Sequence, residues 1–358
     1  RGGSEPGGGA RGTTATAPAT QARPPQVPLD RLAGAMVIAA VERSSGPTAT
    51  LLRRIRAGRV GGVIVADTGP ADGGALARRL QGAAREAGRP PLLVVTDQEG
   101  GLVRRWTDLA PAASAAELGR QGTDATGGAA HAAGCDLLAN GVTLDLAPVA
   151  DAATAPDGFI ARQGRAFAGT SKAAAPYVAA FVRGLHRGGV GATIKHFPGL
   201  GATVVTTDED TTAESPDPGS VAAFTAGIEA GADAVMAASA TYAEGRFATG
   251  GPAVASKETI GRLRGLGFRG VVMTDALDAP GIVDNPRLRD IAVDAVRAGV
   301  DVLLYAEPSG AAAERARGAL VAAVRAGDLP RSRLTEAWDR NGALKRVLAG
   351  RARDADCG

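Results

Sequence analysis

The chain has 358 residues, 45% of them hydrophobic, so it can bury one core of α/β-barrel size or two smaller cores. Its net charge is only +3, and no basic stripe is interleaved with aromatic residues, so we expect no nucleic-acid partner. No apolar run approaches the roughly twenty residues that a membrane span needs, which predicts no integral membrane segment.

Residues 1–27 are rich in Gly, Pro, Thr and Ala and show no apolar periodicity, which predicts a disordered tether. The chain begins with Arg1 rather than methionine, so we infer that a signal or lipoprotein segment has been removed, although an internal starting point would look the same. We therefore expect an extracellular or cell-envelope protein. One domain is predicted over residues 28–350, followed by a tail over 351–358, and we expect a monomer.

From Asp30 onward one pattern repeats: an alanine-rich amphipathic helix, a closing glycine and a short apolar run that ends in polar residues. Such runs are typical of strands buried on both faces, with the helical segments as right-handed crossovers. A series of eight predicts a single-domain (β/α)8 TIM barrel, and a doubly wound open sheet is the alternative. The predicted strands are residues 35–38, 60–65, 92–97, 142–146, 190–195, 234–237, 270–275 and 300–305.

Polar residues follow four of these runs where the predicted strands end. They are Asp97, Asp151, the pair Lys195 and His196, and Asp275. In a barrel, the carboxyl ends of the strands share one rim, and that rim is where chemistry occurs. Each aspartate alone would be weak evidence, because a strand-end aspartate is commonly a helix N-cap. Together they predict one polar mouth.

Lys195 and His196 belong to scarce residue types, since the chain has four lysines and three histidines. The alternative interpretation is a solvated surface lysine beside a core histidine. Pro198 and Gly199 follow the pair directly, which indicates that the backbone is shaped where the charges are placed. This favours a functional site.

A Gly-rich segment follows the third predicted strand. We expect Gly100 and Gly101 to let the backbone approach a ligand closely. Asp97 with the downstream Arg105 suits the paired hydroxyl groups of a sugar, and Arg165 is a second cation on the loop after the fourth strand.

Asp275 emerges from a fully apolar strand. A carboxylate held rigidly there, near cationic donors, can stay ionised and act as a nucleophile or charge stabiliser.

These motifs resemble glycoside hydrolase family 3, specifically its single-domain NagZ-type β-N-acetylglucosaminidases. The resemblance covers roughly residues 30–350 and rests on DQEGG-x-V-x-R at 97–105, APV-x-D at 147–151, R-x-F at 165–167, KHFPG at 195–199 and TDAL at 274–277. It implies that Asp275 is the nucleophile of a retaining mechanism, without metal or organic cofactor. It also implies that the non-reducing-end sugar is bound by Asp97, Arg105, Arg165, Lys195 and His196.

The resemblance implies a retaining exo-β-N-acetylglucosaminidase that hydrolyses terminal β-linked N-acetylglucosamine from cell-wall muropeptides or chitin fragments. Two alternatives stay open. One is a β-glucosidase or β-xylosidase of the same family, although those relatives usually carry a second domain that supplies the acid. The other is a non-catalytic sugar-binding relative.

The loop after the fifth predicted strand departs from the subfamily pattern. Enzymes of this kind usually carry Gly-His-Gly-Asp and then an Asp-x-His pair whose histidine is the acid/base. Here Leu200 and Ala202 replace the first histidine and aspartate, and residues 203–212 contain no histidine. The Asp-bearing, Thr-rich loop resembles the actinobacterial branch of the family, which favours a variant enzyme over an inactive one.

Counting from Lys195, Asp208 occupies the place of the missing histidine, so we hypothesise that Asp208 is the general acid/base, with Glu209 or Asp210 as substitutes. The alternative is a solvated acidic loop that caps the next helix. A calcium site fits less well, because EF-hand spacing is absent. Carboxylates here would repel phosphate, so we expect hydrolysis rather than phosphorolysis.

The last features lie in the outer ring and at the chain end. Helices are predicted over 311–326 and 332–348, with Ser332 as the N-cap of the second. Cys135 falls in a predicted helix, where a buried free thiol is one interpretation, and Cys357 lies near the chain end. A disulfide between them is the other interpretation.

Overall fold

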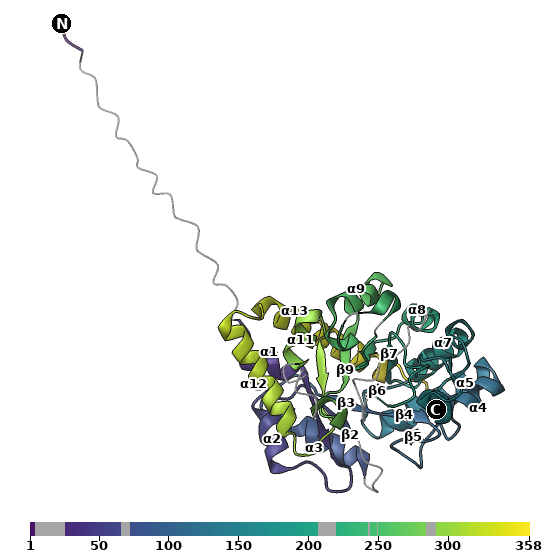
Figure 1. Ribbon diagram of the computed structural model, residues 1–358. Helices are drawn as coiled ribbons and strands as arrows, with labels where there is room; N and C mark the ends of the chain where they lie inside the picture. The colour runs from purple at the N-terminus through teal and green to yellow at the C-terminus, as the bar shows by residue number, and fades with distance from the viewer. Residues whose placement is uncertain (4–25, 66–71, 207–219, 243, 249, 284–290) are drawn as a thin grey trace.

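The computed structural model describes residues 1–3, 26–65, 72–206, 220–242, 244–248, 250–283 and 291–358. Within these residues, eight parallel strands close into a barrel with the spatial order β1-β10-β9-β8-β7-β6-β3-β2 (Figure 1). The predicted (β/α)8 TIM barrel is therefore confirmed, and the open sheet is excluded. The barrel strands are β1 (Val37–Val41), β2 (Gly62–Val65), β3 (Leu93–Thr96), β6 (Leu144–Asp145), β7 (Gly191–Phe197), β8 (Ala234–Ala237), β9 (Val271–Ala276) and β10 (Val302–Leu304).

Each predicted run overlaps one of these strands, and residues 234–237 match β8 at both ends. The first strand starts later than predicted, because Ala35 still belongs to a helix and Met36 is its C-cap. Along β1, Ile38 packs in the barrel interior, whereas Val37 packs outward against the helices. Both faces of the strand are thus buried, which explains why the run is apolar throughout rather than alternating.

Helices surround the barrel, and a short antiparallel hairpin of β4 (Gln98–Gly100) and β5 (Val103–Arg104) extends from the loop after β3. The helices are α1 (Leu29–Ala35), α2 (Ala49–Arg56), α3 (Gly73–Glu86), α4 (Ala115–Gln121), α5 (Thr123–Ala139), α6 (Phe159–Arg162), α7 (Ser171–Arg187), α8 (Ala222–Glu229), α9 (Lys257–Gly265), α10 (Pro280–Val283), α11 (Ile291–Ala298), α12 (Ala311–Ala326) and α13 (Arg331–Arg353).

The ends of the last two helices test the predicted boundaries. Helix α12 matches the predicted 311–326, but α13 begins at Arg331, so Ser332 lies inside its first turn and the predicted N-cap is wrong. Pro330 takes the N-cap position with φ −68°, the value that its ring imposes. Helix α13 also continues to Arg353, three residues beyond the predicted domain boundary.

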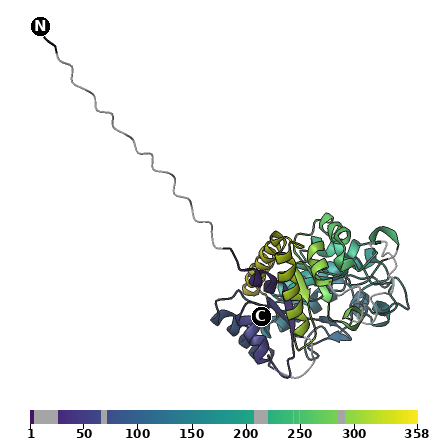
Figure 2. The ribbon, with the colours of Figure 1, turned by 60° about the vertical axis from the view of Figure 1, so that its left-hand side comes forward.

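The first and last parts of the domain meet and complete the ring. Helix α1 lies beside α12 and α13 in both views (Figures 1 and 2). Arg317 of α12 forms an ion pair with Asp30 of α1 at 2.6 Å. Strand β10 pairs with β1 at the same seam, so chain ends far apart in sequence close the barrel.

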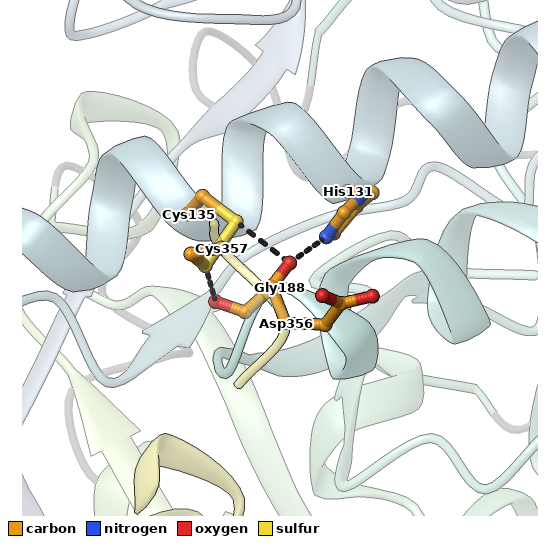
Figure 3. The surroundings of a disulfide bond; sticks show 5 residues. All are labelled: His131, Cys135, Gly188, Asp356 and Cys357. Carbon is orange, nitrogen blue, oxygen red and sulfur yellow. Dashed lines mark hydrogen bonds between the residues drawn. A yellow bond between two sulfur atoms is a disulfide. The ribbon is translucent and has the colours of Figure 1, made fainter. Parts of the chain in front are cut away.

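A disulfide joins Cys135 of α5 to Cys357, and the interpretation of Cys135 as a free thiol is therefore wrong (Figure 3). The segment before Cys357 packs across the ends of α5 and α7, where the backbone N–H of Asp356 donates to the carbonyl oxygen of Arg187 at 2.9 Å. His131 contacts the carbonyl oxygen of Asp356 from α5. The bridge lies at the end of the barrel where β6 and β7 begin.

Of the predicted tether, residues 4–25 fall outside the described residues, so the tether stays a prediction. In the part of the chain that the structure describes, no helix is both long and apolar enough to cross a membrane.

Candidate active site

A cavity of about 290 Å³ opens at the carboxyl ends of the barrel strands. It is lined by Ile64, Asp97, Val103, Arg105, Phe159, Gln163, Arg165, Lys195, His196, Leu200, Thr206, Asp275, Ala276, Leu304 and Ala306. Six of the predicted site residues are in that set, so the barrel brings them to one mouth: Asp97, Arg105, Arg165, Lys195, His196 and Asp275. The predicted acid/base Asp208 and its substitutes Glu209 and Asp210 lie outside the described residues.

Lys195 is buried, with 2% of its surface exposed, and the interpretation as a solvated charge is wrong. Its Nζ lies 2.6 Å from Oδ1 of Asp97 and 2.6 Å from Oε1 of Glu99. Burial by itself would lower the pKa of Lys195, but these two carboxylates outweigh burial and raise the pKa to about 12. Lys195 is therefore a fixed cation that holds Asp97 at the cavity wall.

Glu99 is the centre of this ion-pair network, and the sequence motif did not single it out as a site residue. Arg165 binds it through both ends of the guanidinium group, with Nε to Oε2 and Nη2 to Oε1 both at 2.8 Å. Burial would raise the pKa of Glu99, but Arg165 and Lys195 outweigh burial and lower the pKa to about 2. The same carboxylate raises the pKa of Arg165 against the effect of burial. Glu99 thus links the two cations of the pocket.

The loop that carries Arg105 is held by Gln98. The amide of Gln98 accepts from the backbone N–H of Trp106 at 3.0 Å and donates to the carbonyl oxygens of Trp106 and Ala110 at 3.0 and 2.9 Å. The backbone N–H of Arg105 donates to the carbonyl oxygen of Asp97 at 3.1 Å. The two sugar-binding candidates Asp97 and Arg105 are therefore positioned by direct main-chain contact.

The Gly pair of this segment does not lie against the cavity, contrary to the prediction. A Cβ atom on Gly100 would lie 2.2 Å from the carbonyl oxygen of Ala113, and one on Gly101 would lie 2.7 Å from Cβ of Ser114. Their φ angles are +101° and +57°, which L side chains rarely adopt. These glycines let the β4–β5 hairpin pack on the protein's own backbone.

Asp275 lies in β9, and its Oδ1 accepts from the backbone N–H of Ala276 at 2.8 Å. Two carboxylates line the cavity, and Asp97 is already paired with Lys195. In the described parts of the chain, Asp275 forms no ion pair. It is therefore the lining carboxylate whose charge remains available to a bound molecule.

Asp145 of β6 lies within the barrel with none of its surface exposed, and no motif of the sequence marks it as a site residue. Its Oδ1 accepts from the backbone N–H of Gln98 at 3.0 Å, whereas Oδ2 has no hydrogen-bond partner. Burial, aided by the nearby Asp97 and Glu99 charges, raises the pKa of Asp145 to about 8. Asp145 is therefore protonated at neutral pH, which leaves Lys195 and Arg165 balanced by Asp97 and Glu99.

Asp145→Asn is expected to stabilise the protein increasingly as pH rises from about 4 to about 8. The unfolded carboxyl group releases its proton near pH 3.8, whereas the folded one keeps it until about 8. Between these values the wild-type protein loses stability with rising pH, by up to roughly 5 kcal/mol across the window, and the amide does not titrate. Urea unfolding of both proteins at pH 4, 6 and 8 measures the difference. A difference that stays constant with pH would contradict a protonated Asp145.

Among the residues that the structure describes, no group of three or more His, Cys, Asp or Glu side chains is arranged to hold a metal ion. The calcium alternative concerned the loop with Asp208, which lies outside the described residues.

Comparison with known proteins agrees with this geometry. Residues 35–343 match the family described as the glycosyl hydrolase family 3 N terminal domain. A β-hexosaminidase from Xanthomonas campestris pv. campestris is 37% identical over 246 residues, which cover 64% of this chain and 72% of that protein.

Two solved structures share the fold over 90% of this chain, each with a TM-score of 0.81. A β-N-acetylhexosaminidase from Beutenbergia cavernae is 31% identical, with 99% of that chain covered. A glycoside hydrolase family 3 β-N-acetylglucosaminidase from a Paenibacillus species is 30% identical, with 63% of that chain covered. The chain therefore belongs to glycosyl hydrolase family 3 and is a glycoside hydrolase.

Proposed function

We propose that this chain is a retaining exo-β-N-acetylglucosaminidase that releases terminal β-linked N-acetylglucosamine from cell-wall muropeptides or chitin fragments. The observation that carries the proposal is the separation of charges in the cavity. Among the described residues Asp275 forms no ion pair, whereas two of the three cations that line the same cavity, Lys195 and Arg165, are held by Asp97 and Glu99. The relatives named above, a β-hexosaminidase and two enzymes acting on β-linked N-acetylhexosamine, support this substrate class.

In this mechanism Asp275 attacks the anomeric carbon, and the glycosidic bond breaks as the leaving oxygen takes a proton from an acid. The same group, now a base, takes a proton from water, which attacks the anomeric carbon, breaks its bond to Asp275 and releases the sugar with its configuration retained. Asp97, Arg105, Arg165, Lys195 and His196 hold the hydroxyl and acetamido groups of the sugar. A volume of about 290 Å³ is at the lower end of small-molecule sites, which favours one terminal sugar residue and hence exo action.

We propose Asp208 as the acid. Thr206, which lines the cavity, stands two positions before it in the sequence. In retaining enzymes the acid carboxyl group lies about 5–5.5 Å from the nucleophile, so the proposal requires Asp208 to come within that distance of Asp275.

Asp208→Ala is expected to lower kcat/KM for a chitin disaccharide by about 10²- to 10⁴-fold while sparing kcat/KM for nitrophenyl N-acetylglucosaminide. Nitrophenolate leaves without protonation, whereas a sugar alkoxide does not. Glu209→Ala and Asp210→Ala are the matched controls, because each removes one carboxylate from the same loop. Equal losses of kcat/KM on both substrates, or none, would exclude Asp208 as the acid that protonates the leaving group.

The substrate class is tested by comparing nitrophenyl N-acetylglucosaminide with nitrophenyl glucoside and nitrophenyl xyloside. We expect kcat/KM to be highest for the first. A preference for either of the others would favour the β-glucosidase or β-xylosidase alternative, and binding without turnover of any glycoside would favour a sugar-binding protein. Added phosphate should leave the product as free N-acetylglucosamine.

We also propose that the enzyme acts as a monomer outside the cytoplasm, as a secreted protein or a lipoprotein. The Cys135–Cys357 disulfide supports this location, because disulfides persist in oxidising compartments.

A further inference from the structure

Asp151 follows β6 and is buried, with 1% of its surface exposed. Its carboxylate accepts three hydrogen bonds from residues 196–200. Oδ1 accepts from the backbone N–H groups of His196 and Leu200 at 3.1 and 2.9 Å, and Oδ2 lies 2.7 Å from Nδ1 of His196. One side chain thus holds both ends of this turn and one edge of the imidazole ring.

Which atom donates in the hydrogen bond between Asp151 and the ring of His196 follows from which of the two groups can carry a proton. An ionised carboxylate can only accept, so Nδ1 of His196 carries the proton and donates to Asp151. In the neutral ring Nε2 then holds a lone pair and no proton. No described residue bonds Nε2, and His196 lines the cavity, so Nε2 is the polar atom that the ring offers to a bound molecule.

Nε2 of His196 differs from the neighbouring polar groups in its charge and in whether it donates or accepts hydrogen bonds. The other polar side chains that line the cavity are three cations, two carboxylates and two neutral groups that can donate as well as accept: Lys195, Arg105, Arg165, Asp97, Asp275, Gln163 and Thr206. Among the lining residues described, His196 in this tautomer is the neutral group that accepts without donating. A hydroxyl group that donates to Nε2 keeps its oxygen available to a neighbouring cationic donor.

We propose that Asp151 is a positioning residue that sets the tautomer of His196, so that Nε2 accepts a hydrogen bond from a sugar hydroxyl group. The identity of the ligand rests on the proposed function. The tautomer does not, because it depends on the contacts of Asp151 alone.

Asp151→Asn should reverse the polarity of the ring. The amide oxygen must stay toward the two backbone N–H groups, because the opposite orientation would set the amide N–H₂ against them. The amide nitrogen then donates to Nδ1 of His196, and the ring proton moves to Nε2. The cavity gains a donor where it had an acceptor, so KM for nitrophenyl N-acetylglucosaminide should rise about 10- to 100-fold with kcat changed only a few-fold.

Nitrogen-15 NMR of the imidazole rings measures the tautomer directly, and the chain has only three histidines. His186 bonds Oδ2 of Asp233 through Nε2 at 2.9 Å, so it holds the opposite tautomer and serves as an internal reference. We expect a protonated Nδ1 on His196 in the wild-type protein and a protonated Nε2 in Asp151→Asn. Asp233→Asn is the matched control: it alters the other His–Asp pair, at the end of the barrel where β7 and β8 begin, and should leave KM unchanged.

Two results would overturn the proposal: a wild-type His196 that carries a proton on Nε2, or a switched tautomer in Asp151→Asn with unchanged KM. If Asp151→Asn does not fold, titration of the wild-type protein with N-acetylglucosamine tests whether Nε2 of His196 contacts the sugar. The Nε2 resonance must shift as the sugar saturates the site, and an unshifted resonance overturns the proposal. A protein that neither binds this sugar nor cleaves its glycosides contradicts the proposed function, while the tautomer of the unliganded protein still tests the part assigned to Asp151.

Discussion

Asp275→Ala is expected to lower kcat for nitrophenyl N-acetylglucosaminide by on the order of 10⁴-fold or more, with the thermal unfolding of the protein unchanged. Asp275 lines the cavity, and no described cation neutralises it, so its carboxylate can attack the anomeric carbon. Without that carboxylate the covalent glycosyl-enzyme cannot form, and an activated leaving group does not compensate. Steady-state kinetics and a melting curve on the same preparation measure the two quantities.

Adding azide distinguishes two causes of lost activity in Asp275→Ala: the absence of the nucleophile and a distortion of the site. In Asp275→Ala the small anion can enter the vacated space and attack the anomeric carbon, so turnover should recover and yield the α-glycosyl azide. Asp294→Ala is the matched control, because it removes one exposed carboxylate from α11 away from the cavity. A normal kcat in Asp275→Ala would exclude this residue as the nucleophile.

Breaking the Cys135–Cys357 disulfide is expected to lower the free energy of unfolding by about 5 kcal/mol. The bridge spans 222 positions of sequence, so its loss releases a very long loop in the unfolded chain. Domains of this kind have net stabilities of about 5–15 kcal/mol, and the expected loss is therefore a large fraction of the total. The kcat value should not change below the melting temperature, since the bridge lies at the end of the barrel opposite the cavity.

Urea unfolding of Cys135→Ser, Cys357→Ser and the double variant measures this effect. The three proteins should lose equal stability, because each lacks the same covalent bond. Dithiothreitol should bring the wild-type protein to their level and leave the variants unchanged. A wild-type curve that is insensitive to full reduction would contradict a stabilising bridge.

The strands could be read from the sequence because their signal is local. A barrel strand has both faces buried, and the eight apolar runs therefore stand out between amphipathic helices. Boundaries were less accurate where neighbouring elements compete, as at α13, where Pro330 rather than Ser332 holds the N-cap position. The predicted role of Gly100 and Gly101 was wrong, because their actual role depends on a backbone segment that packs against them.

The site could be predicted in outline but not in its contacts. Barrel topology gathers strand ends, so Lys195, His196 and Asp275 were expected at one mouth, and they are found there. Glu99 was overlooked because its importance comes from Arg165, 66 positions away, whose guanidinium group it binds. Asp145 was overlooked because the neighbouring sequence does not indicate that Oδ2 would be buried without a hydrogen-bond partner.

The sequence by itself determined the architecture, the family motifs and the residue types that gather at the rim, because periodicity and spacing are written along the chain. Tertiary structure alone decided which of those residues are charged and toward what they point. Lys195 forms an ion pair with Asp97, which lies 98 positions away in the sequence. Asp145 keeps its proton because its carboxyl group is buried. Electrostatic energies depend on distance and burial in space, and neither is encoded in any short stretch of the chain.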